Sequence, residues 1–467
     1  MKKTFIYFLF TASFLFTSCE LDELPTGQLI EEFAITDANS AENALNGAYL
    51  AFAGQSVDWI TGLEATNWME DHERIPSYLA GTAFFTGNPL FGVADNVVSS
   101  DESAPIWVNR YALVSAANGV IQSVEGLSDT GFEDNRKSEI IAEAKFLRAY
   151  GHFSLLTYYG QYYDTNSEFG VIIRNSLVTA TEIAISRSTV AETYDSIISD
   201  LDEAISDMPA SNEIYYANVW TAKLLKARVL LYKGDYSEAK NLALDIINNG
   251  PYQLDNMQGL FQFNGFNSSE VILGIQPYET QFAHQRVYLY HFFFGQGNTL
   301  TTTFTDLLNG DPRRPWMVGF DWDGNNNILT KYGQFPNPNG IIENSYAFRL
   351  TEAYLIVSEA FAREGDEDSS RTYLKDVLTQ GGITDFSSVD AATGADLLYE
   401  IFLEYYKNMS FEDGHEWFAL HRLVDFEDVT QLRPGIESIN QYILPIPRRE
   451  LERNFSFGSQ NPGYDSI

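Results

Sequence analysis

The sequence is poor in cysteine and in basic residues. One Cys among 467 residues excludes an intrachain disulfide framework, a structural zinc site built from cysteines and a cysteine-held iron–sulfur cluster within this chain. Only 29 Lys and Arg stand against 64 Asp and Glu, which gives a formal net charge of −35. Because nucleic-acid binding depends on Lys and Arg contacts with phosphates, this balance argues against a nucleic-acid partner.

Long apolar runs are also missing. The run near the N-terminus covers residues 5–16, follows Lys2 and Lys3, and ends before two small residues. A bilayer span needs about 20 apolar residues, so this pattern predicts a signal peptide over residues 1–18 and not a membrane helix. No later segment offers about 18 consecutive apolar residues, so we expect the rest of the chain to lie outside the bilayer.

The only cysteine follows this predicted signal directly. Residues 16–19, Phe-Thr-Ser-Cys, resemble the box of a bacterial lipoprotein signal, which is cut before a cysteine that becomes lipidated. We therefore expect lipidation at Cys19 and a tether over residues 19–35, with an ordinary secretory signal as the alternative. The acidic residues after Cys19 are similar to the surface-export signal of Bacteroidota lipoproteins, although a plain solvated tether explains them equally well.

Apolar residues make up 45% of the chain, which is enough for a sizeable core and excludes global disorder. Most strong periodicities are helical. Residues 194–208 carry apolar side chains at the spacing of a one-sided helix, with Thr189 and Glu192 as a capping box and Pro209 as its end. This composition and periodicity predict a mainly helical protein.

Two predicted helices near the middle of the chain are joined by a very short turn. They cover about 217–233 and 236–249, with Gly234 as the turn and Asp235 and Glu238 as caps. Such helices must lie antiparallel, and the small Ala227 and Ala239 permit close approach, as in a tetratricopeptide repeat. Further helical stripes occur at 138–160, 346–364 and 396–411.

We therefore expect a mainly α fold of tetratricopeptide-like helix pairs, with long irregular loop regions that carry minor β structure. Residues 36–467 are interpreted as a single domain whose N-terminal half ends at about 215 and whose C-terminal half covers 216–467.

Two irregular stretches, roughly 55–105 and 255–345, are rich in Gly, Asn, Pro and aromatic residues. Long loops in compact domains are often functional, and exposed aromatic rings in them can contact a ligand. The alternative for each ring is packing in the core below the loop. The candidate ligand-binding residues are Trp59, Trp68, Asp71, Tyr78, Trp316 and Trp322.

Several motifs, in order over nearly the whole chain, resemble those of one family. Each is weak alone, but the order and spacing together are specific. Two depart from the family pattern, with Lys145 and His415 each replacing an expected Arg. The segments of this chain, each followed by the family pattern that it resembles, are AEAKFLRAY at 142–150 (EARFLRAY), DPR at 311–313 (DPR), FRLTEAYL at 348–355 (RLAEVYL), EDGH at 412–415 through Arg422 (EG-R-x-x-D-L-x-R), and the closing LPIP at 444–447 and QNPGY at 460–464.

The chain thus resembles the SusD/RagB nutrient-binding lipoproteins of the Bacteroidota. This resemblance implies four tetratricopeptide-like helix pairs and an outer-membrane protein that faces the exterior. It also implies a partner, a SusC-like TonB-dependent transporter that receives captured oligosaccharides. Peptide capture, as in RagB-like members, a glycosidase activity and a plain scaffold role remain alternatives, because the motifs do not encode the ligand.

Signatures of catalysis and of metal binding are missing from the sequence. His415 and His421 are six residues apart and cannot form an HExxH pair, and neither GxSxG nor a Walker A sequence is present. The acidic segment from Asp321 has Asn326 and Tyr332 where a calcium loop needs Gly and Glu, so an Asp/Asn-Gly turn is expected. We expect no catalytic residues, no metal and no cofactor.

Overall fold

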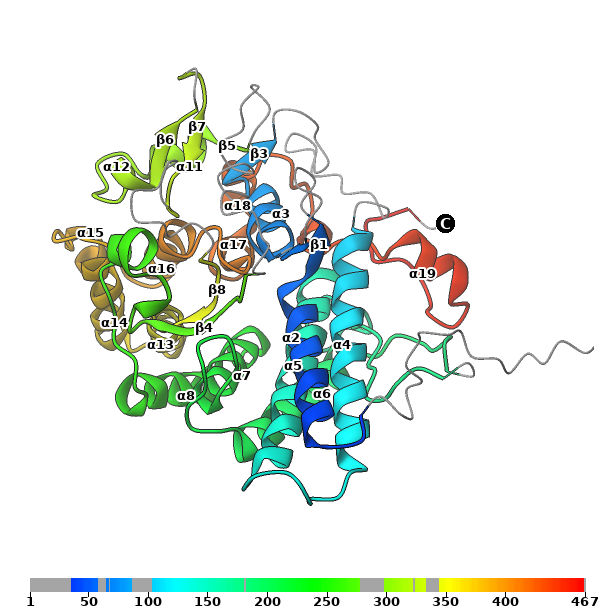
Figure 1. Ribbon diagram of the computed structural model, residues 1–467. Coiled ribbons are helices and arrows are strands. Elements are labelled where there is room, and N and C mark those ends of the chain that lie inside the picture. The colour runs from blue at the N-terminus through cyan, green and yellow to red at the C-terminus, as the bar shows by residue number, and fades with distance from the viewer. Residues whose placement is uncertain are drawn as a thin grey trace, which may run out of the picture.

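The structure is a computed structural model that describes residues 35–57, 64–66, 68–85, 103–179, 182–277, 298–321, 324–332 and 344–465. Helices dominate it and the strands are short, as Figure 1 shows. The predicted mainly α fold with minor β structure is therefore confirmed. Among the described residues, none of the helices combines the length and apolarity that crossing a bilayer requires.

The longer helices are α2 (Ala38–Ala53), α4 (Ala104–Glu125), α5 (Arg136–Tyr159), α6 (Val190–Asp207), α7 (Val219–Lys233), α8 (Tyr236–Asn249), α13 (Leu350–Glu364), α14 (Glu367–Gln380), α16 (Ala395–Asn408) and α17 (His415–Leu423). The shorter ones used below are η1 (Met69–Arg74), α3 (Ile75–Ala80), η2 (Leu260–Asn264), α12 (Arg314–Met317) and α19 (Arg448–Arg453).

The sequence explains where α6 begins and how α7 turns into α8. The Thr189 side chain accepts from the backbone N–H of Glu192, whose carboxylate accepts from the Thr189 N–H, so the predicted capping box is confirmed. Gly234 ends α7 with a φ of 95°, a left-handed conformation that favours glycine. Asp235 occupies the predicted N-cap position of α8, but its carboxylate makes no capping hydrogen bond and accepts from Lys233 instead (2.6 Å).

Helix pairs form the left and lower parts of Figure 1, where α7 packs against α8 and α13 against both α8 and α14. Ala227 and Ala239 are fully buried, consistent with the close approach of α7 and α8 that their small size permits. The helix predicted from residue 346 begins later. Residues 346–349 form strand β8, which pairs with β4 (Val271–Gly274), so a helix is wrong at these four positions.

The strands form four antiparallel pairs among the described residues. These are β1 (Gln55–Val57) with β2 (Glu64–Thr66), β3 (Ala83–Phe85) with β5 (Asn298–Leu300), β4 with β8 (Tyr346–Arg349), and β6 (Val318–Phe320) with β7 (Asn327–Leu329). The β3–β5 pair aligns Ala83 with Leu300, and the Thr301 hydroxyl donates to the Gly81 carbonyl (2.7 Å). It therefore joins the two irregular stretches at the top of Figure 1.

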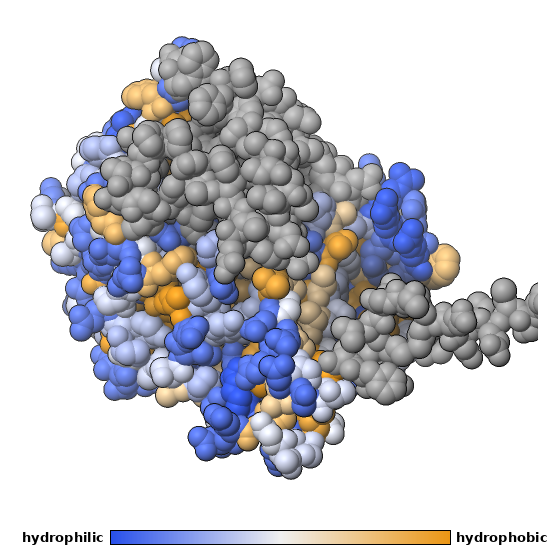
Figure 2. Space-filling view, in the orientation of Figure 1, coloured by the Kyte–Doolittle hydropathy of each residue, from blue (hydrophilic) through white to orange (hydrophobic). Residues whose placement is uncertain are grey.

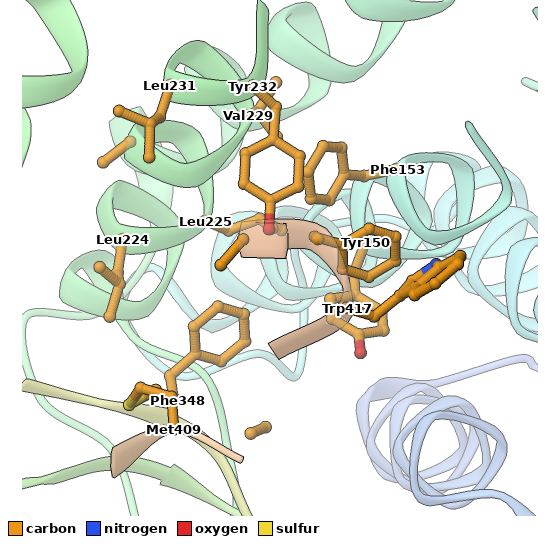
Figure 3. Packing of buried hydrophobic residues seen from close by; sticks show 14 of the residues in the cluster. Tyr150, Phe153, Leu224, Leu225, Val229, Leu231, Tyr232, Phe348, Met409 and Trp417 are labelled. Atoms are coloured by element: carbon orange, nitrogen blue, oxygen red, sulfur yellow. The ribbon is translucent and has the colours of Figure 1, made fainter. Parts of the chain in front are cut away.

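The core is continuous between the helix pairs and the strands. Figure 3 shows Tyr150 of α5 and Phe348 of β8 close to Leu224 and Leu225 of α7. The Tyr150 and Phe348 rings meet nearly edge to face, with centroids 6.2 Å apart. Burial of side chains of this size stabilises a fold by about 1.5–3 kcal/mol each. The same core thus supports both halves of the chain.

Candidate ligand-binding face

Two aromatic candidates from the first irregular stretch are buried. Trp68 is 1% exposed and Tyr78 is 4% exposed. The Trp68 ring stacks on His72 with centroids 3.6 Å apart and planes 5° apart. The expectation that these two rings lie in an exposed loop is wrong, because the chain from residue 68 to 80 is helical and packs its aromatic side chains inward.

Asp71, expected to contact a ligand hydroxyl, is also buried at 2% exposure. Its Oδ2 accepts a hydrogen bond from the Asn109 amide of α4 (2.7 Å) and lies 3.6 Å from the Arg110 guanidinium. Asp71 is buried because it lies in η1, a helical segment where a ligand-contacting loop was expected. Its carboxylate serves to hold η1 against α4.

Trp316 is half-buried and keeps part of its ring at the surface. Its carbonyl accepts from the Gln262 amide (3.1 Å) and from the Thr330 hydroxyl (2.8 Å), which fix α12 between η2 and the strand β7. Trp316 is thus the one predicted ring that the described residues leave partly accessible. The predicted residues Cys19, Trp59 and Trp322 lie outside the described residues.

The acidic segment after β6 forms a tight turn. Oδ1 of Asp321 accepts from the backbone N–H groups of Asn325 (2.9 Å) and Asn326 (3.2 Å), and Gly324 has a φ of 74°. The predicted Asp/Asn-Gly turn is confirmed, and it closes the β6–β7 hairpin. Among the described side chains, no three His, Cys, Asp or Glu are grouped as metal ligands.

A group of buried charged and aromatic side chains surrounds Asp413. Its Oδ1 accepts from Tyr150 and from His72 (2.7 Å each), and its Oδ2 accepts from Arg228 (2.5 Å). Burial alone would raise the pKa of the Asp413 carboxyl, but the Arg228 charge and the His72 hydrogen bond hold that pKa well below its usual range. Burial, followed by the charge of Arg110, lowers the pKa of His72 to about 4.

A second buried group surrounds Arg349 of β8. Its guanidinium donates to Glu412 (2.6 Å), to Glu270 (2.7 Å) and to the Asn408 side chain (2.7 Å). Lys331 also donates to Glu412 (2.5 Å). Such pairing is what permits charges to stay buried, because an unpaired buried charge is strongly unfavourable.

Other charged residues of the recognised motifs form buried pairs of the same kind. Arg148 of α5 binds Asp200 of α6 through two hydrogen bonds (2.8 and 2.5 Å). Arg313 does the same with Glu404 of α16 (2.7 and 2.8 Å). Asn461 near the C-terminus donates to two buried backbone carbonyls. The motifs therefore join helices to each other and hold the C-terminal segment in place.

A pocket of about 300 Å³ opens at the end of α2, next to the end of β4. Two half-buried neighbours in sequence, Tyr215 and Tyr216, line it together with Asn46. We call it the tyrosine pocket. Figure 2 shows apolar surface near the C-terminal end of α2, below the grey atoms. Sequence reasoning missed these residues, because they lie between two predicted helices and outside the irregular stretches.

A larger groove of about 910 Å³ lies between α4, residues 172–178 with Ile183, and α19. Its exposed apolar side chains are aliphatic: Val108, Val178 and Ile183 are 60%, 48% and 59% exposed. Arg449 and Arg453 of α19 line it together with Glu450 and Glu452. Helix α19 lies at the right of Figure 1, where the surface in Figure 2 is hydrophilic. We call this cavity the arginine groove.

Comparison with known proteins finds similarity to SusD-like proteins. The family model described as starch-binding and associating with the outer membrane, SusD-like, matches residues 56–231. A crystal structure of a SusD superfamily protein from Bacteroides thetaiotaomicron has a TM-score of 0.75 at 23% identity, with 91% of this chain and all of that chain covered. The predicted resemblance to the SusD/RagB family is confirmed.

Other SusD-like proteins match this chain over part or all of their length. The SusD-like protein P2 of Formosa agariphila is 23% identical, with 99% of this chain and 100% of that protein covered. A SusD-like protein of Bacteroides ovatus is 24% identical over 57% of this chain and 48% of its own length. A solved laminarin-binding SusD-like protein has a TM-score of 0.71 at 18% identity, covering 92% of this chain and 100% of that one.

Proposed function

We propose that this protein binds glycans at the cell surface and delivers oligosaccharides to a SusC-like TonB-dependent transporter. One observation carries the proposal: the SusD-like fold extends over 92% of the chain, and a protein that shares it over its whole length is described as binding laminarin. A family description that includes starch binding and association with the outer membrane supports the same ligand class and location.

The proposal includes a lipid anchor on Cys19 and a position on the outer face of the outer membrane. It rests on the sequence pattern of residues 1–19. Two or more acyl chains give stable anchoring, since each buried CH₂ contributes about 0.8 kcal/mol. Metabolic labelling with a palmitate analogue is expected to label the wild type and not Cys19→Ala. Equal labelling of both would contradict the anchor.

Affinity electrophoresis against a polysaccharide panel that includes starch and laminarin tests glycan binding. We expect at least one glycan to slow the wild-type protein, and Trp316→Ala to reduce that effect because Trp316 is the partly exposed ring of the predicted set. Retardation by none of the glycans would contradict the proposed function. Release of reducing sugar from the bound glycan would contradict a role in binding without cleavage.

Peptide capture is a second candidate, and the arginine groove favours it. Aliphatic side chains such as Val108 and Ile183 suit peptide side chains better than sugar rings, and the exposed Arg449 and Arg453 suit acidic residues. Fluorescence anisotropy with an acidic, Leu-containing peptide tests this. Binding that is lost in Arg449→Ala/Arg453→Ala, with no glycan binding by the wild type, would make peptide capture the function.

A further inference from the structure

The tyrosine pocket is built from three parts of the chain that lie far apart in sequence. Asn46 comes from α2, Tyr215 and Tyr216 from the connection between α6 and α7, and Gln276 follows β4. The Gly274 backbone N–H donates to the Ile214 carbonyl (2.8 Å), which ties the connection to the end of β4. A Cβ at position 274 would lie 2.5 Å from the Phe266 ring, so this close approach requires glycine.

Each tyrosine ring of the pocket is held by a specific contact. The Tyr216 hydroxyl donates to Oδ1 of Asn46 (2.9 Å), and its ring meets Tyr49 edge to face with centroids 4.9 Å apart. Tyr49 in turn donates to the buried Glu143 (2.6 Å). The Tyr215 ring meets Phe266 edge to face at 5.2 Å. Rings held in this way offer surface to a ligand at low entropic cost.

The chemistry of the lining selects among ligands. None of the described residues that line the pocket carries a charge, and its polar groups are the amides of Asn46 and Gln276 and the tyrosine hydroxyls. Amides and hydroxyls bond sugar hydroxyls, whereas carboxylates or sulfates would need Arg or Lys. Burial raises the pKa of Tyr216, so its hydroxyl stays protonated and can donate. The volume of about 300 Å³ suits a single ring unit.

We propose that the tyrosine pocket binds one neutral hexose unit of a glycan, with Tyr215 and Tyr216 as the apolar contact and Asn46 and Gln276 bonding its hydroxyls. This inference rests on the proposed function, and it names a site and a substrate class: uncharged oligosaccharides. It predicts that uronate-containing or sulfated oligosaccharides bind this pocket more weakly than neutral ones, because none of the described residues that line it is a cation that could balance their charge.

Isothermal titration calorimetry with neutral oligosaccharides, including maltohexaose and laminarihexaose, tests the site, with oligogalacturonate as the charged probe. Aromatic stacking contributes about 1–3 kcal/mol, so Tyr215→Ala should weaken neutral binding about 5- to 150-fold. Tyr216→Phe keeps the ring, removes the bond to Asn46 and should weaken binding less. Tyr373→Ala is the matched control, since Tyr373 is a half-buried tyrosine on α14 and does not line the pocket.

The outcomes separate the pocket from the proposed function. Neutral binding by the wild type and Tyr373→Ala, with a loss in Tyr215→Ala at an unchanged melting temperature, supports the pocket. Equal binding by wild type and Tyr215→Ala overturns the pocket and leaves glycan binding intact. A preference for oligogalacturonate overturns the neutral class. Binding of no oligosaccharide by the wild type overturns both the pocket and the proposed function.

Discussion

The interior around Asp413 and the tyrosine pocket differ in the kind of residue that defines them. The interior joins α5, α7, α13 and the segment before α17 through buried, paired charges such as Arg228 with Glu352 and Asp413. The pocket uses half-buried aromatic rings and amides without charge. Charged motif residues that are recognisable in sequence thus serve the fold, whereas the residues suited to a ligand lie elsewhere and belong to no recognised motif.

The largest effect on stability is expected from a substitution that removes one partner of the buried charge pairs. Arg228→Ala leaves the buried carboxylates of Glu352 and Asp413 without their guanidinium partner, so we expect a loss of about 3–5 kcal/mol in the free energy of unfolding. Urea denaturation measures it. Arg448→Ala is the control, because its pair with Glu452 is largely exposed, and it should change stability by less than about 1 kcal/mol. Equal effects of the two variants would contradict the distinction.

A comparable loss is expected from Trp68→Ala. Trp68 is buried against His72 and Phe52, so its removal should cost about 3 kcal/mol or more in unfolding free energy. Trp316→Ala should cost less, because its ring is only partly buried. Thermal and urea denaturation of the two variants compare them. If Trp68→Ala is as stable as the wild type but binds glycan more weakly, then Trp68 contacts the ligand, and the structural role given to it here is contradicted.

A buried carboxyl group in the interior, that of Glu416, makes the stability of the protein depend on pH. Glu416 is fully buried, its Oε1 accepts from the Phe411 N–H (2.9 Å), and its Oε2 has no hydrogen-bond partner among the described residues. Burial raises the pKa of Glu416 to about 8, from an ordinary value of 4.5. Its contribution to stability is therefore fully present below pH 4.5 and is lost as the pH rises toward 8.

Glu416→Gln keeps the shape of the protonated acid and removes this titration. We expect the wild type to lose about 2–4 kcal/mol more than Glu416→Gln between pH 5 and pH 8. Urea denaturation at the two pH values measures the difference, and parallel pH dependence of both proteins would show that Glu416 is ionised in the fold. The wild type serves as the reference in this comparison. Gln380→Glu would not serve as a control, because the Gln380 amide donates a hydrogen bond to the buried carboxylate of Glu270 and the substitution would remove it.

The smallest effect is expected at exposed aromatic residues outside both regions. Phe320 is 66% exposed and Phe455 is 92% exposed. Replacing either with Ser removes little buried surface, so the unfolding free energy should change by less than about 0.5 kcal/mol. Glycan affinity should also be unchanged. A loss of affinity in Phe320→Ser would show that the β6–β7 hairpin also contacts the glycan.

The helical part of the fold was predictable because its signals are local. The capping box at Thr189 and the turn at Gly234 each depend on residues within one turn of helix, and both are confirmed. The helical periodicity gave a wrong prediction for residues 346–349, because the strand that they pair with, β4, lies about 75 positions away in the sequence. Strand pairing over that separation leaves no trace in a short window of sequence.

The candidate site was less predictable for a related reason. Trp68 and Tyr78 share a stretch with many loop-forming residues, yet the segment that contains them is helical and buries them. Tyr215 and Asn46 meet only because α2, the α6–α7 connection and β4 converge, a contact that depends on the whole fold. An adjacent pair of tyrosines between helices was the only signal in the sequence, and it is weak.

A crystal structure of the protein with the glycan that binds most strongly in the panel would test the account most directly. We predict one sugar ring between Tyr215, Tyr216 and Asn46, the interior charge pairs unchanged, and an intact glycan. A glycan bound in the arginine groove with an empty tyrosine pocket, or a sugar in contact with the Asp413 group, would contradict it.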